Sequence, residues 1–163
     1  MHKLTTMTAM IMTTLFVVAA PADARPAHNE HFTIIFTGAP GSPGTVHAAG
    51  VISGRGTITP NEDDESGLDT LVLPDGTITL VSTTTTSVQT PTQPVCITRF
   101  SSTGTFDIVG GTGAYSGLGG HGTVNDHGLT RSLNGPEGCS DTPIAVHAVL
   151  HLEGTVTGSQ VDR

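Results

Sequence analysis

Apolar and polar residues alternate with a period of two along much of the chain. In the segment 31–36, the side chains of Phe32, Ile34 and Phe36 would share one face of an extended backbone. Alternation of this kind is typical of a β-strand with one buried face. Similar segments recur along the chain, at residues 46–58, 68–73, 77–81, 95–101, 105–109, 122–125 and 144–157. We therefore expect about eight strands and no helix, which is typical of an antiparallel barrel or sandwich.

Turn-forming residues separate some of these segments. Pro74-Asp75-Gly76 contains an Asp-Gly pair between two β-rich runs, and this pair favours a tight hairpin turn. Ser102-Thr103-Gly104 is predicted to form a second hairpin, between residues 95–101 and 105–109.

Three polar segments are predicted to interrupt the strands. Residues 61–65 form an acidic loop, whose carboxylates lack the spacing of a calcium-binding loop. Residues 83–94 are too polar and too rich in proline for a central strand. Residues 126–143 are expected to form a long loop.

The composition excludes several classes of protein. Among 163 residues there are 21 Gly, 10 Pro and no Trp, and only 12% are charged, which is unlike a helical bundle or a coiled coil. Hydrophobic residues make up 36% of the chain, enough to form a core and to argue against intrinsic disorder. The formal net charge of −8 argues against nucleic acids and anionic membranes as partners, because both attract basic surfaces.

The first 24 residues have the organisation of a secretory signal peptide. Lys3 precedes an apolar stretch from about Met7 to Ala20, and Ala22-Asp23-Ala24 has the small-x-small pattern of a cleavage site. The apolar stretch is shorter than the roughly 20 residues of a membrane-spanning helix. We therefore predict a secreted protein without membrane attachment after cleavage, whose single domain comprises residues 25–163.

Export favours a disulfide between the only two cysteines, Cys96 and Cys139. A metal site formed by these two residues is less favoured, because no Cys-x-x-Cys motif is present. A catalytic thiol is also disfavoured, because the disulfide would consume it.

Histidine is the other candidate for metal binding. Seven histidines follow residue 24, but His147 and His151 would lie about 13 Å apart on one strand, too far to share an ion. We predict no metal site and no cofactor, and we expect the strand histidines to face solvent or another subunit. Residues 117–122 formally fit the Gly-x-Gly-x-x-Gly pattern, but no helix is expected after them to bind a nucleotide phosphate.

The glycine-rich segment 104–123 resembles the allene oxide cyclase and dirigent-type barrel superfamily. The matching features are a strand with Phe106 and Ile108, the tetrad Gly110-Gly111-Thr112-Gly113, and the aromatic residue Tyr115. The resemblance implies a closed eight-stranded antiparallel barrel with a lumen open at one end, and assembly as a trimer. In plants such barrels bind apolar or phenolic intermediates and direct a ring closure or a radical coupling. No segment matches the catalytic acid, Asn or Arg positions of the plant families, so the catalytic residues are left unassigned.

We therefore predict a secreted barrel that binds a small hydrophobic or phenolic ligand in an apolar lumen, and that orients it for cyclisation or coupling. The predicted ligand contacts are Phe32, Phe36, Arg99, Phe106 and Tyr115, although Arg99 has the parity of a solvent-facing residue. The side chains expected to line the lumen are Phe32, Phe36, Ile52, Phe100, Phe106, Ile108, Val146 and Leu150. The alternative is a non-catalytic structural or interaction barrel with a packed lumen, whose histidine-bearing strands form a subunit interface.

Overall fold

A computed structural model describes residues 27–59 and 68–158, and it contains eight β-strands and one short 3₁₀-helix in these ranges. The predicted signal peptide and the predicted acidic loop at 61–65 lie outside the described residues. The strands are β1 (His28–Gly38), β2 (Gly44–Gly50), β3 (Gly54–Thr59), β4 (Leu68–Leu73), β5 (Gly76–Thr92), β6 (Ile97–Gly111), β7 (Gly119–Gly135) and β8 (Gly138–Thr157), and the 3₁₀-helix η1 (Gly113–Tyr115) lies between β6 and β7.

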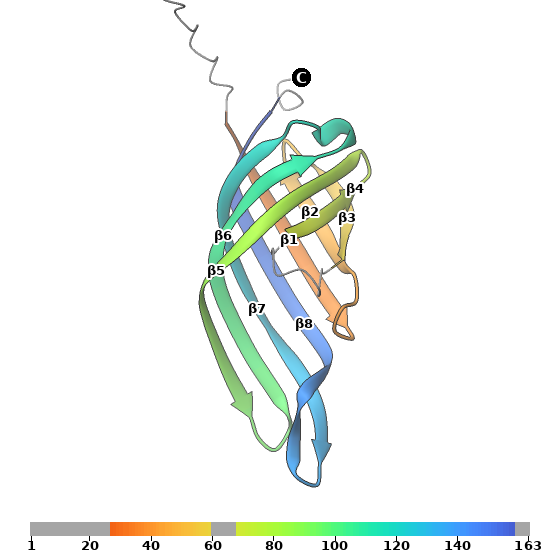
Figure 1. Cartoon of the computed structure of the whole chain (residues 1–163), viewed down its shortest axis with the longest axis vertical. Coiled ribbons are helices and arrows are strands. Elements are labelled where there is room, and N and C mark those ends of the chain that lie inside the picture. Colours follow the sequence, from red (N-terminus) through yellow and green to blue (C-terminus); the bar gives the residue numbers. More distant parts are fainter. Residues whose placement is uncertain (1–26, 60–67, 159–163) are drawn as a thin grey trace, which may run out of the picture.

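Each strand pairs antiparallel with the next one along the chain, and β1 also pairs with β8, so that the sheet forms a ring (Figure 1). The predicted eight-stranded antiparallel barrel is therefore confirmed. The hairpin at Pro74-Asp75-Gly76 is also confirmed, because β4 and β5 meet there with Leu73 opposite Gly76. In the described part of the chain, no helix has the length and apolarity needed to cross a membrane.

The strands differ greatly in length. β1 to β4 have 11, 7, 6 and 6 residues, whereas β5 to β8 have 17, 15, 17 and 20. β5 is paired with β4 only as far as Val81, and β8 with β1 only from Val146 onward. The long strands therefore continue beyond the ring as a four-stranded sheet, which we call the extension (Figure 1).

The extension contradicts three predictions, namely one hairpin turn and two of the polar loops. The predicted hairpin at 102–104 is wrong, because β6 runs through it and pairs with β5 on one side and β7 on the other. Gly104 does not form a turn but allows a close approach of two strands, since a β-carbon there would lie 2.1 Å from the carbonyl oxygen of Thr83.

The predicted loops at 83–94 and 126–143 are also wrong for most of their length. β5 continues to Thr92, but beyond Val81 it is an edge strand, where polar residues and Pro91 are tolerated. β7 and β8 extend to a tight turn at Pro136-Glu137. These segments are polar because they belong to an open sheet rather than to the ring.

The core fills the ring. Every strand except β7 contributes fully buried side chains, and the largest are Phe32, Ile34, Val46, Ile58, Leu71, Ile78, Leu80, Phe106, Leu152 and Val156. β7 contributes Val124, which is 9% exposed. Of the residues predicted to face inward, Phe32, Ile52, Phe106 and Ile108 are buried, and Phe36 and Leu150 are partly buried against the core. Phe100 and Val146 are only half-buried: Phe100 lies in the extension, and Val146 lies at its border, opposite Gly38 of β1.

The glycine tetrad Gly110-Gly111-Thr112-Gly113 attaches one end of the barrel to the β4–β5 hairpin. The Thr112 N–H donates to the Thr77 carbonyl at 2.9 Å, and the Ala114 N–H donates to the Asp75 carbonyl at 2.8 Å. Gly113 has φ +61°, and a β-carbon there would lie 2.3 Å from the Asp75 oxygen. A β-carbon at Gly111 would likewise lie 2.5 Å from the Tyr115 oxygen, so the close packing of this attachment accounts for Gly111 and Gly113.

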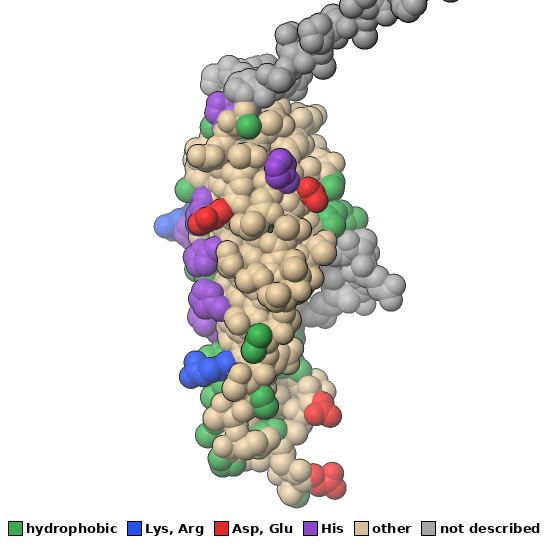
Figure 2. All heavy atoms as spheres, turned by 90° about the vertical axis from the view of Figure 1, so that its left-hand side faces the viewer, with side chains coloured by type: hydrophobic (Ala, Val, Ile, Leu, Met, Phe, Trp, Pro, Cys, Tyr) green, Lys and Arg blue, Asp and Glu red, His purple; other side chains and the backbone are tan. Residues whose placement is uncertain are grey.

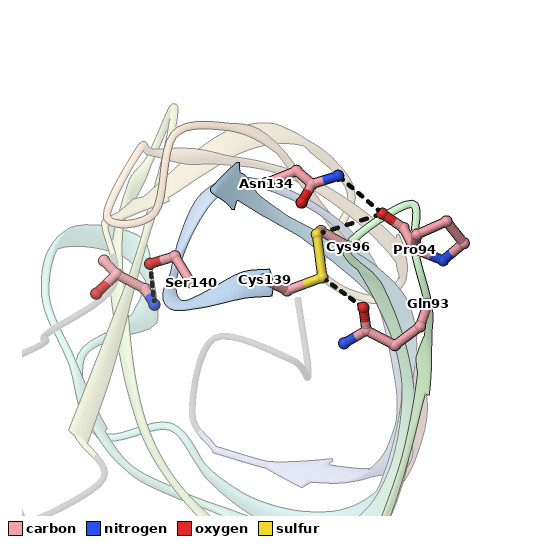
Figure 3. Close-up of a disulfide and its surroundings, with 7 residues drawn as sticks. Gln93, Pro94, Cys96, Asn134, Cys139 and Ser140 are labelled. Atoms are coloured by element: carbon pink, nitrogen blue, oxygen red, sulfur yellow. Dashed lines mark hydrogen bonds between the residues drawn. A yellow bond between two sulfur atoms is a disulfide. The ribbon is translucent and has the colours of Figure 1, made fainter. Parts of the chain in front are cut away.

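The predicted disulfide between Cys96 and Cys139 is confirmed (Figure 3). It joins the β5–β6 connection to the β7–β8 hairpin, at the far end of the extension. Asn134 Nδ2 donates to the Pro94 carbonyl at 3.2 Å, and the Ser132 N–H donates to the Cys96 carbonyl at 2.9 Å. Covalent and hydrogen bonds therefore hold the two tips together.

Candidate functional site

The inner face of the barrel changes in character where the ring passes into the extension. Cross-strand pairing places Phe36, Ala148, Gly128 and Phe100 in one row across β1, β8, β7 and β6. The Phe100 ring lies over Gly128, where a β-carbon would be only 2.8 Å from its Cζ atom. Both phenylalanines remain partly accessible, so this row is an apolar surface that the core does not fully cover.

The next row toward the ring contains a polar pair. It consists of Ile34, Leu150, Asp126 and Ser102, again on β1, β8, β7 and β6. The Ser102 hydroxyl donates to Asp126 Oδ2 at 3.4 Å. Asp126 Oδ1 is enclosed by the protein and has no hydrogen-bonding partner among the described residues. A carboxylate therefore lies on the inner face in one row with Ile34 and Leu150, with most of its capacity to accept hydrogen bonds unused.

Burial raises the pKa of the Asp126 carboxyl above its ordinary value, and the hydrogen bond from Ser102 and the nearby His127 only oppose this rise. A desolvated carboxyl with one weak partner gains from any further donor that reaches it. We call Asp126 and Ser102 the inner polar pair, and they lie in the row next to the Phe36–Phe100 row.

A second inward carboxyl lies at the opposite end of the ring. Glu30 is 3% exposed, and its Oε2 accepts the Ile52 N–H at 3.0 Å. Burial raises its pKa, whereas the N–H groups of Ile52, His31 and Val51 lower it. The carboxyl group therefore anchors the turn between β2 and β3, which is a structural role.

Tyr115 lies at the same end as Glu30. It is 8% exposed and belongs to the hydrophobic core, and burial raises the pKa of its hydroxyl, with further contributions from Asp75 and Glu30. A cavity of about 190 Å³ borders it, between the β2–β3 turn, Asp75 and Leu118. Tyr115 helps to close this end of the barrel.

The structure separates the five predicted ligand contacts. Phe32 and Phe106 lie within the packed core, at 0% and 1% exposure. Phe36 lies at the border of the extension, and Tyr115 at the opposite end. Arg99 is exposed on the outer face of β6. Phe32 and Phe36 lie in the two rows on either side of the inner polar pair, and of these two only Phe36 is partly accessible.

Sequence reasoning did not identify Asp126, Ser102 or Glu30. The sequence pattern predicts a loop at Asp126 and a turn at Ser102, whereas both lie within strands. The sequence pattern could have identified two of them. In the alternation along each strand, Glu30 falls on the same side as the buried Phe32, and Asp126 on the same side as the buried Val124. A carboxylate on the apolar side of an alternating strand is unusual enough to mark a candidate site.

The described residues contain no group of three or more His, Cys, Asp or Glu side chains that could hold a metal ion. Comparison of the chain with protein-family models, with curated proteins and with solved structures gave no match. The candidate site is therefore defined by geometry, and the resemblance of residues 104–123 to the cyclase and dirigent barrels stays a prediction.

Proposed function

We propose that the protein binds a small, largely apolar molecule at the open side of the barrel lumen, with a hydroxyl group of that molecule donating to Asp126. The observation that carries this proposal is the inner polar pair next to the half-covered Phe36–Phe100 row. Ligand sites are typically apolar surfaces with a few placed polar groups. A phenol or an alcohol with an apolar body would match both the inner polar pair and the Phe36–Phe100 row.

The same arrangement supports an orienting role. A ligand whose hydroxyl is held by Asp126 presents its apolar body to Phe36 and Phe100 in one direction, as a cyclisation or coupling of that body would require. The disulfide supports a secreted location, because such bonds persist mainly outside the cytosol.

The test compares 2-naphthol with 2-methoxynaphthalene, which lacks the hydroxyl donor. Binding is measured by displacement of the fluorescent probe N-phenyl-1-naphthylamine. We expect 2-naphthol to bind about tenfold more tightly, since a hydrogen bond to a charged group contributes at least this much. Asp126→Ala should abolish the difference, and Asp107→Ala, which changes an exposed carboxylate on β6, should leave it intact.

A second pair of variants tests the apolar row. Phe100→Ala should weaken the binding of both naphthalenes, whereas Val88→Ala, which truncates a residue that is 61% exposed, should not. If neither compound displaces the probe from the wild-type protein, the proposal fails.

The second candidate function is a non-catalytic structural or interaction barrel. It is favoured by the dense packing of the ring, where Phe32 and Phe106 are almost fully covered. In this case the outer surface would carry the function, and the protein would bind neither naphthalene.

A further inference from the structure

Five histidines gather on the outer face of the barrel: His31 on β1, His47 on β2, His127 on β7, and His147 and His151 on β8. Figure 2 shows histidine side chains one above another along one side of the molecule. The ring centroids of His31 and His151 are 5.9 Å apart, as are those of His127 and His151. We call this group the histidine column.

Threonine hydroxyls bind several of these rings and hold them in place. Thr33 Oγ1 lies 3.2 Å from His31 Nε2 and 3.5 Å from His151 Nδ1. Thr37 Oγ1 lies 3.2 Å from His147 Nδ1. The outer face thus presents imidazoles and hydroxyl groups side by side.

Few fixed charges surround the column. Glu153 Oε1 on β8 lies 3.4 Å from His31 Nδ1. Arg55 on β3 lies opposite His47 in the strand register. Arg99 on β6 is separated from His147 only by Leu129 on β7. The other titratable groups on the outer face of these strands are Asp107, His121 and Arg131, whereas the carboxyls of Glu30 and Asp126 point inward.

Two arginines and one carboxylate leave the face of the column close to neutral when the imidazoles are uncharged. Imidazole is the side chain that ordinarily gains its proton between about pH 8 and 5. A protonated column would therefore be a row of cations on a chain whose formal charge is −8 at pH 7 with neutral histidines. Charges on other faces are largely screened beyond about 10 Å at 0.1 M salt.

We propose that the histidine column binds a polyanionic sugar polymer, carboxylated or sulfated, and that this binding is switched on by mildly acidic pH. A row of closely spaced cations along the barrel complements a linear chain of anionic groups. The neighbouring threonine hydroxyls can form hydrogen bonds with sugar hydroxyls.

Other occupants fit this face less well. Single-stranded nucleic acids require exposed aromatic side chains for stacking, but the phenylalanines of the described strands point inward and Tyr115 is buried. A second copy of the chain would bring two histidine columns together, and such a contact would weaken on acidification. The sign of the pH dependence therefore distinguishes the polymer from self-association.

The test measures the affinity of the intact, disulfide-bonded protein for heparin and for polygalacturonate by isothermal titration calorimetry. Between pH 7.5 and 5.5 we expect the affinity for at least one of the two polymers to rise by about tenfold, as several new exposed ion pairs would produce. Binding at pH 5.5 should weaken with added salt, and neutral dextran should not bind.

Matched variants locate the site. His127→Gln combined with His151→Gln should remove the rise in affinity at pH 5.5, because it breaks the centre of the column. His121→Gln, on the same face but opposite Asp107, should retain it. Circular dichroism checks that the variants are folded. Equal binding at both pH values, equal binding by both variants, or self-association at pH 7.5 without polymer binding at pH 5.5 would overturn the proposal.

Discussion

Individual side chains of this barrel are placed where they are sensitive to protonation. Asp126 is the main case, because its carboxyl faces an apolar interior and its pKa is raised by burial. The folded state therefore binds this proton more tightly than the unfolded chain does. The resulting contribution to stability is fully present below the unfolded pKa, about 3.9, and is lost as the pH rises through the folded value.

Replacing Asp126 with Asn should consequently change how stability depends on pH. Relative to the wild type, Asp126→Asn should become progressively more stable as the pH rises from 4 to about 7.5, because no buried charge forms. The free energy of unfolding is measured by urea denaturation at several pH values. Glu30 is present in both proteins, so its titration cancels. The same change in Asp107→Asn would contradict the explanation.

At the scale of the element, the predictions that hold are those that depend on local chemistry. The β4–β5 hairpin was predicted because Asp75-Gly76 favours a tight turn whatever surrounds it. The turn predicted at 102–104 does not form, because Ser, Thr and Gly are also compatible with a strand that has partners on both sides. Whether these residues form a turn or continue a strand depends on the strands beside them. The local sequence carries no information about those strands.

The attachment of the glycine tetrad to the β4–β5 hairpin can be tested with a matched pair of variants. Gly113 and Gly117 have similar backbone angles, φ +61° and +74°, but only Gly113 lies against another backbone segment. Gly117→Ala should lower the unfolding free energy by about 1 to 2 kcal/mol, the cost of a left-handed alanine. Gly113→Ala should lower it further, because its methyl group meets the Asp75 carbonyl. Equal losses in urea denaturation would argue against the attachment.

The whole molecule has two parts that are stabilised differently. The ring is held by a dense core, whereas the extension is a four-stranded sheet with partly accessible apolar residues and a disulfide between its tips. Because the cysteines are 43 residues apart, the disulfide restricts a long loop of the unfolded chain.

Removing the disulfide should therefore destabilise the protein strongly. Cys96→Ser combined with Cys139→Ser should lower the unfolding free energy by about 4 kcal/mol in the chain-entropy model. Amide hydrogen exchange should accelerate most in the extension, at residues 83–92 and 138–145, where each edge strand has one partner. Uniform acceleration through the ring would show that the two parts do not open separately.

The amino-acid sequence by itself determined the strand period, the approximate number of strands, the disulfide and the inward parity of residues such as Phe32 and Phe106. These follow from the alternation of side chains and from the presence of only two cysteines. Tertiary structure decided which strands extend beyond the ring. It also decided that Asp126 and Ser102 meet inside the barrel, and that histidines from β1, β2, β7 and β8 gather on its outer face. The physical reason is that parity is a property of one strand, whereas a site depends on the register between strands far apart in the chain.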